Sequence, residues 1–243
     1  MKHLLSWLLL TLLTGCYQMT ESKENETDTG GADVDADGDT NSDSETETET
    51  ESRCDEVICS GSYFITFAYD LSKIQNCTTI LGDVIVSQLH SGSPDNLATS
   101  LAVLGCLERI EGDLSFENLK TIENLHGLEN LNHVGGNVQI GMAFIEGEHG
   151  GIIGYSIGRN RSLLDLSGLE GLVRVEGGMI IGENPQLTSL EELSSLSKID
   201  GDLIIRDNER LPTCEAMRLR DQLQTIGKES DIVNNLEDNC SDD

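Results

Sequence analysis

The sequence predicts a mainly β fold, a solenoid of about five stacked coils with short helical caps. Three observations predict it. One short phrase recurs five times, apolar residues recur at every third position between its copies, and both ends of the chain lack the phrase. Repetition at a fixed period is typical of architectures in which each unit buries its apolar face only against its neighbours.

The phrase consists of a branched apolar residue, any residue, Gly, usually Asp or Asn, and then apolar-x-apolar. Its copies read CTTILGDVIV from Cys77, LERIEGDLSF from Leu107, LNHVGGNVQI from Leu131, LVRVEGGMII from Leu172 and LSKIDGDLII from Leu196. Each copy predicts a tight bend at Gly followed by a strand. Two intervals between copies are 24 residues long, which falls in the leucine-rich-repeat range.

Between the copies, apolar residues at every third position fit neither a straight α-helix nor the two-residue period of a strand. One such run is Leu119, Ile122, Leu125, Leu128 and Leu131. The spacing predicts a chain that turns corners while always pointing a residue inward. Asn160, Asn184 and Asn208 occupy the same place in successive copies, and we expect each to bond the backbone of a neighbouring coil.

Strand alternation sends Val84 and Val86 inward, so the residues before and between them face outward. These outward positions are the candidate ligand face: Asp83, Asp113, Asn137 and Asp202 in one column, and Ile85, Ser115, Gln139, Ile180 and Ile204 in the other. Stacked carboxylates repel, and either a bound cation or, as the favoured reading, nearby backbone N–H groups relieve them. The isoleucines form either an apolar contact patch or ordinary surface.

Longer intervals mark insertions, about six residues within Ser87–Asn96 and a Gly-rich stretch from Gly141 to Ser156. Inserts in a solenoid become loops on one face, often the binding face, although a tolerated surface loop is the favoured interpretation of the second insert. Short helices are expected at the ends, over Asp70–Ile74 and Glu215–Leu223.

The N-terminus predicts export and a lipid anchor. Residues 1–15 have the basic start and short apolar run of a signal peptide, and Leu13-Thr14-Gly15-Cys16 resembles the bacterial lipobox. The resemblance implies cleavage before Cys16 and acylation of that residue, which would anchor the protein stably in a membrane. Tyr17 replaces the Asp of an inner-membrane retention signal, so we expect the outer membrane or cell surface of a Gram-negative bacterium.

Residues 16–53 read as a disordered acidic tether, since they contain thirteen Asp or Glu, one Lys, one Arg and Val34 as the only branched aliphatic residue. Within the tether, Asp33, Asp35, Asp37 and Asp39 resemble a calcium loop, but the acidic residue expected at its twelfth position is Ser44. We expect a plain spacer and no cofactor, with weak calcium binding as the alternative. The net charge of −29 argues against nucleic acid as a partner.

Six cysteines follow Cys16, an even number that predicts disulfides in an exported protein. Cys214 and Cys240 are the two beyond the last copy, so we expect them to close a C-terminal cap. The other four lie at the N-terminal end, and position alone leaves their pairing open: Cys54, Cys59, Cys77 and Cys106.

The stretch from Cys59 to about Cys214 resembles the receptor L-domain, the leucine-rich-repeat-like right-handed β-helix of insulin- and epidermal-growth-factor-type receptors. The residues at the start of this stretch carry the resemblance: Cys59, then Cys77-Thr78-Thr79-Ile80-x-Gly82-x-Val84-x-Val86. It implies a Cys59–Cys77 disulfide, which leaves Cys54 to pair with Cys106. The whole chain also resembles surface lipoproteins of myxobacteria-like genomes. The sequence contains no cysteine-rich module or kinase, so the resemblance implies no receptor signalling.

The predicted function is non-catalytic recognition of a protein or glycan by a surface lipoprotein whose residues 54–243 form the folded domain. Two alternatives stay open. One is a structural protein of the cell envelope. The other is a calcium-dependent polysaccharide-lyase-like enzyme, which the outward columns disfavour because they hold Asp but no Lys or Arg. No catalytic residue and no metal ligand in the folded part are predicted.

Overall fold

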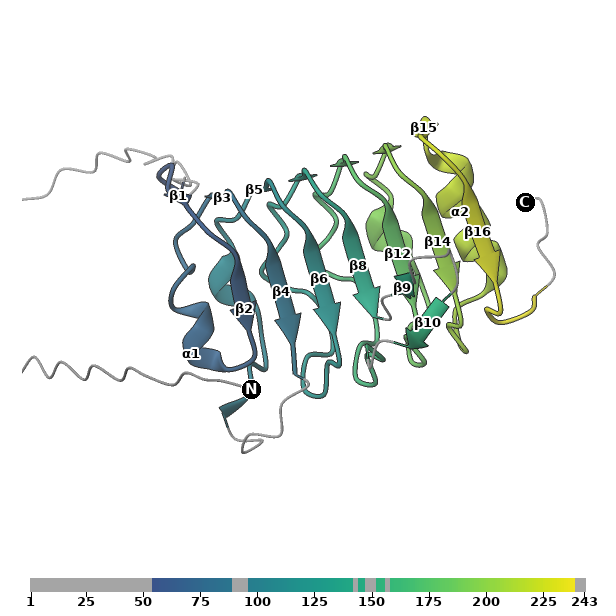
Figure 1. Cartoon of the computed structure of the whole chain (residues 1–243), viewed down its shortest axis with the longest axis horizontal. Coiled ribbons are helices and arrows are strands. Elements are labelled where there is room, and N and C mark those ends of the chain that lie inside the picture. Colours follow the sequence, from purple (N-terminus) through teal and green to yellow (C-terminus); the bar gives the residue numbers. More distant parts are fainter. Residues whose placement is uncertain (1–53, 89–95, 142–143, 147–151, 156–157, 239–243) are drawn as a thin grey trace, which may run out of the picture. The chain divides into compact units, whose positions relative to one another are not determined.

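The computed structural model describes residues 54–88, 96–141, 144–146, 152–155 and 158–238, within a compact unit that spans Thr50–Asp243. This part is mainly β, with two seven-stranded sheets and few helices (Figure 1). Every neighbouring pair of strands within these sheets is parallel. The mainly β prediction is therefore confirmed.

Each copy of the phrase contributes one strand to each sheet. The first sheet contains β1 (Ile58–Cys59), β3 (Thr79–Ile80), β5 (Arg109–Ile110), β7 (His133–Val134), β11 (Arg174–Val175), β13 (Lys198–Ile199) and β15 (Thr225–Ile226). The second sheet contains β2 (Tyr63–Ile65), β4 (Val84–Ser87), β6 (Leu114–Glu117), β8 (Val138–Gly141), β12 (Met179–Gly182), β14 (Leu203–Arg206) and β16 (Ser230–Val233).

The five predicted copies supply five of the seven strands in each sheet, so the estimate of about five was two too low. The first additional copy keeps the frame but has Cys59 in place of the branched residue and Ser62 in place of Asp. The last places Ser230 opposite the apolar Leu203 and moves its Gly by one position. Both departures hid the copies from a pattern built on apolar residues.

Apolar side chains from both sheets and from the connecting segments fill the interior. Val84 and Val86 are 1% exposed, and the predicted run from Leu119 to Leu131 is at most 1% exposed throughout. Burial of each such side chain stabilises the fold by about 1.5–3 kcal/mol relative to exposure. The inward positions predicted from the sequence are confirmed.

The Gly of the phrase is required because neighbouring copies approach closely at the bend. A Cβ added to Gly112 would lie 2.6 Å from the carbonyl carbon of Gly82, and one added to Gly201 would lie 2.6 Å from the amide nitrogen of Gly178. Neither Gly112 nor Gly201 has a positive φ. Lack of a side chain, rather than a left-handed backbone, therefore explains why Gly stands here.

The three asparagines form the predicted ladder. Asn160, Asn184 and Asn208 are fully buried, and each donates its side-chain amide to a backbone carbonyl of a preceding copy, those of Phe116, Ile140 and Ile181. They also bond one another, since the Asn160 Nδ2 donates to Asn184 Oδ1 and the Asn184 Nδ2 donates to Asn208 Oδ1. Their role is to satisfy buried backbone groups between strands.

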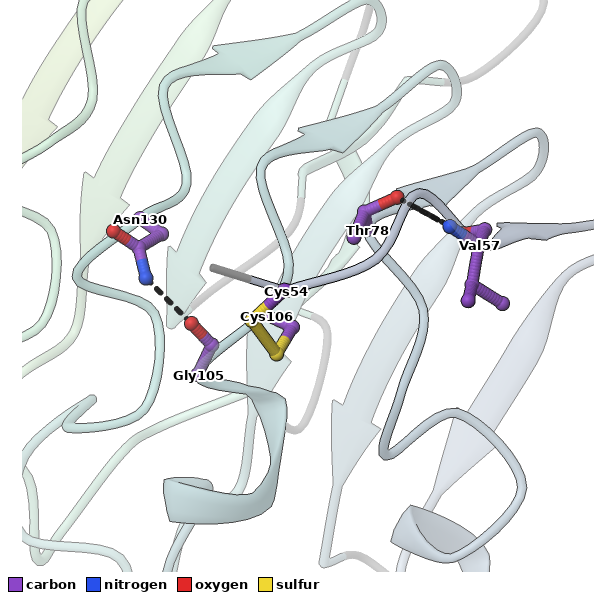
Figure 2. Close-up of a disulfide and its surroundings, with 6 residues drawn as sticks. All are labelled: Cys54, Val57, Thr78, Gly105, Cys106 and Asn130. Carbon is purple, nitrogen blue, oxygen red and sulfur yellow. Dashed lines mark hydrogen bonds between the residues drawn. A yellow bond between two sulfur atoms is a disulfide. The ribbon is translucent and has the colours of Figure 1, made fainter. Parts of the chain in front are cut away.

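Two disulfides secure the N-terminal end. Cys59 pairs with Cys77, as the family resemblance implied, and Cys54 pairs with Cys106. Figure 2 shows the Cys54–Cys106 disulfide and two hydrogen bonds near it. In one, the Val57 N–H donates to Thr78 Oγ1, and in the other Asn130 Nδ2 donates to the Gly105 carbonyl. Closing loops of 18 and 52 residues stabilises the fold by about 3 and 4 kcal/mol in the chain-entropy description.

The helix α2 (Thr213–Gln222) confirms the helix predicted over Glu215–Leu223, with its start two residues earlier. Its predicted role as the C-terminal cap is wrong, because β15 and β16 follow it and form the last copy of each sheet. Cys214 is disulfide-bonded, and its predicted partner Cys240 lies outside the described residues. Near the N-terminal end, α1 (Ala68–Leu71) starts two residues and ends three residues earlier than the helix expected over Asp70–Ile74. The earlier start follows from Asp70, which caps the helix by accepting the N–H groups of Thr66 and Phe67.

Four smaller elements of the described residues lie outside the two sheets. Two short 3-10 helices, η2 (Ala102–Leu104) and η3 (Glu191–Leu193), lie in the connecting segments. The Gly141–Ser156 insert, expected as a loop, contains an antiparallel pair formed by β9 (Phe144–Glu146) and β10 (Ile152–Tyr155). The expected insert near Ser87–Asn96 falls largely on residues outside the described part.

Candidate functional site

The predicted ligand face lies on the outer surface of the second sheet. The register brings Ile85, Ser115, Gln139, Ile180 and Ile204 side by side across β4, β6, β8, β12 and β14. Phe64 of β2 extends this row beside Ile85 and is 53% exposed. The sequence prediction missed Phe64, because its copy of the phrase was not recognised.

The Asp and Asn column along the same face is a hydrogen-bond ladder. Asp83 Oδ1 accepts the Asp113 N–H at 2.9 Å, Asp113 Oδ1 accepts the Asn137 N–H at 2.6 Å, and Asn137 Oδ1 accepts the Gly178 N–H at 2.8 Å. Backbone amides thus offset the stacked carboxylates, as the favoured reading expected. Asp202 repeats the pattern farther along, where its Oδ1 accepts the Glu229 N–H.

A shallow groove of about 630 Å³ crosses the middle of this face. It brings together seven of the nine predicted ligand-face residues, and Asp202 and Ile204 lie outside it. Its complete lining is Asp83, Ile85, Asp113, Leu114, Ser115, Glu117, Asn137, Gln139 and Ile180. The groove is open to solvent and of the size at which proteins hold small ligands or single side chains of a partner.

The floor of the groove is polar and organised around one carboxylate. Ser115 is 8% exposed and donates its hydroxyl to Glu117 Oε1, which also accepts the Gln139 Nε2 at 3.1 Å. Because Ser is small beside its neighbours Ile85 and Gln139, the surface is hollowed at this position. Sequence reasoning missed Glu117, although alternation places it as the next outward residue after Asp113 and Ser115.

The outer surface of the first sheet has a different electrostatic character. Arg109, His133, Arg174 and Lys198 occupy equivalent positions in neighbouring strands. Each Arg and Lys of this row forms an ion pair with an acidic side chain. Arg109 pairs with Glu111 at 2.5 Å. Arg174 and Lys198 both pair with Asp200, at 2.9 and 2.8 Å. The Arg and Lys side chains of this surface are therefore neutralised by acidic neighbours.

His133 is enclosed within these charges. Burial lowers the pKa of His133 below its ordinary value of 6.5, and the neighbouring guanidinium of Arg109 lowers it further. Glu176 opposes this effect, with Oε1 at 3.3 Å from the His133 Nε2. His133 is therefore mainly neutral near pH 7.

No cluster of three or more His, Cys, Asp or Glu side chains in the described residues has a geometry that could hold a metal ion. The calcium candidates Asp33, Asp35, Asp37 and Asp39 and the lipidation candidate Cys16 lie outside the described part of the chain. Among the described residues, no helix has the length and apolar character needed to cross a bilayer.

Comparison with known proteins supplies no assignment for this site: no protein-family model matches the chain, and no curated protein matches it.

Proposed function

We propose that this chain is an exported, non-catalytic recognition protein that binds a protein or glycan on the outer face of its second sheet. The observation that carries the proposal is the groove, because it gathers side chains from four strands that the sequence had already placed on one face. Parallel strands supported from beneath by a rigid core hold these side chains in fixed positions, which favours binding.

We further propose that the two sheets are the faces of a right-handed β-helix of the receptor L-domain type. Three features support this assignment. The chain alternates between the sheets, each strand pairs with its equivalent in the next copy, and the disulfide that the resemblance implied, Cys59–Cys77, is present. A measured structure with a left-handed or open arrangement would contradict the proposal.

The proposed location is the outer membrane or cell surface, with the lipid on Cys16 as the anchor and residues 16–53 as an acidic tether. The disulfides support export, and the lipobox-like motif supports the lipid anchor. Replacement Cys16→Ser is expected to move the exported protein from the membrane fraction to the soluble fraction. Retention of the variant in membranes would contradict the lipid anchor.

Binding is tested by screening the oxidised, exported chain against surface proteins and glycans, with and without calcium. A saturable partner is expected, and Ile180→Asp is expected to weaken it at least tenfold because a charge replaces an apolar contact in the groove. Leu164→Asp is the matched control, since Leu164 is 44% exposed and does not line the groove. Failure to bind any partner would favour a structural role in the envelope.

A further inference from the structure

The groove carries a local negative charge that its own residues do not neutralise. Asp83, Asp113 and Glu117 line it, and its lining contains no Lys, Arg or His. Within the described residues, Asp113 Oδ2 and Glu117 Oε2 accept no hydrogen bond from a side chain or backbone. By contrast, Glu111 and Asp200 on the first sheet form ion pairs with Arg and Lys side chains.

The two carboxylates flank the hollow at Ser115. Asp113, Ser115 and Glu117 are alternate residues along one extended stretch, so their side chains leave the same face at intervals of about 6.8 Å. A single ammonium or guanidinium group placed above Ser115 therefore has a carboxylate on either side. The charge of the groove is complementary to one cation held at this point.

In the direction perpendicular to the strands, an apolar side chain lies at each end of the groove. Ile85 and Ile180 lie three strands apart, which corresponds to about 14 Å at the usual spacing between strands. In an extended peptide, residues i, i+2 and i+4 share a face, and i to i+4 spans about 13 Å. An extended segment laid across the strands thus matches both apolar ends and the acidic centre.

We propose that the groove binds an extended peptide segment of the pattern apolar-x-basic-x-apolar. The inference rests on the proposed recognition function and names the ligand class for the same groove. The apolar side chains contact Ile85 and Ile180, and the central Lys or Arg reaches between Asp113 and Glu117 above Ser115. The side chains at the two intervening positions point to solvent, so they carry little specificity.

The test measures binding of the exported chain to three synthetic peptides by fluorescence anisotropy. The first, GSVTKTVSG, has the proposed pattern. The second, GSVTETVSG, reverses the central charge, and the third, GSVKTTVSG, has the composition of the first but directs Lys to the opposite face of an extended segment. We expect saturable binding of the first peptide, at least tenfold weaker binding of the other two, and weakening of the first by added salt.

Variants locate the contact. Glu117→Gln keeps the acceptor for Ser115 and Gln139, so it is expected to leave the fold intact while weakening the first peptide at least fivefold. The matched control is Glu108→Gln, the same change at an exposed residue that lies outside the groove and immediately before β5 of the first sheet. Glu117→Lys is expected to reverse the preference and favour the acidic peptide.

Three results would overturn the inference. Equal affinities for the three peptides, or affinities unchanged by Glu117→Gln, would show that charge and spacing are not recognised. Binding of an oligosaccharide in place of every peptide, abolished by Ile180→Asp, would overturn the peptide class while leaving the proposed recognition function intact. Absence of binding to any peptide and to any oligosaccharide, with no partner in the wider screen, would contradict the proposed function itself.

Discussion

Two ladders of Asn and Asp side chains connect neighbouring copies, one inside the molecule and one on its surface. The inner ladder, Asn160, Asn184 and Asn208, is 0% exposed, and its amides donate to backbone carbonyls and to one another. The outer ladder uses one oxygen of Asp83 and Asp113 to accept a backbone N–H. The inner ladder therefore serves the fold alone, whereas the outer one leaves Asp113 Oδ2 without a partner among the described residues, at the groove.

The largest expected effect is on the inner ladder. Asn184→Ala leaves the Ile140 carbonyl and the Asn160 amide without their partner in a dry interior, so the free energy of unfolding should fall by about 3 kcal/mol. Chemical denaturation measures the change. Asn132→Ala, at an exposed asparagine, is the control and should change the value by less than about 0.5 kcal/mol.

A somewhat smaller loss is expected from Gly112→Ala, which tests the close approach that brings the outer ladder together. The added methyl would overlap the backbone of Gly82, so stability should fall by about 2 kcal/mol. Gly105→Ala is the matched control, because the nearest atom to its added Cβ is 3.6 Å away and its φ is −57°. Equal effects of the two changes on thermal unfolding would contradict the packing argument.

The outer ladder should be less costly to remove. Asp113→Ala deletes two bonds from Asn137, but water can replace them at this exposed site, so the expected loss is about 1 kcal/mol. Asp113→Asn retains an acceptor and should lose less. A loss as large as that of Asn184→Ala, measured by the same chemical denaturation, would remove the distinction between the two ladders.

The smallest effect concerns the pH dependence of the first sheet. Because the folded state lowers the pKa of His133, the unfolded chain binds the proton more tightly, and stability is lost as the pH falls below about 6.5. The charged groups that act on this imidazole are Arg109, Arg174, Glu111 and Glu176. His133→Gln should therefore flatten the dependence of the unfolding free energy on pH just below about 6.5, and an unchanged slope would contradict this origin.

Much of the fold could be predicted because the phrase repeats with little variation. Alternation within the strands identified the inward Val84 and Val86, and the shared offset of Asn184 and Asn208 identified the ladder. The end copies escaped because Cys59 and Ser230 stand where an apolar residue is usual. The first and last copies each pack against a neighbouring copy on one side only, so they tolerate such changes.

The candidate site was predicted in part for a related reason. The pleat of a strand indicates which residues face outward, so Asp113, Ser115 and Gln139 were found. A hollow depends on the relative sizes of neighbouring side chains, and only the register places Ser115 beside Ile85 and under Glu117. The pairing of β9 with β10 was hidden by the glycines around it.

The most direct test of the central claim measures stability and partner binding on one double variant, Glu117→Gln with Ile180→Asp. If the outer face of the second sheet is a recognition surface, the free energy of unfolding should stay within about 1 kcal/mol of the parent, as for ordinary surface substitutions. Saturable binding should fall at least tenfold. Binding equal to that of the parent in a folded double variant would contradict the account.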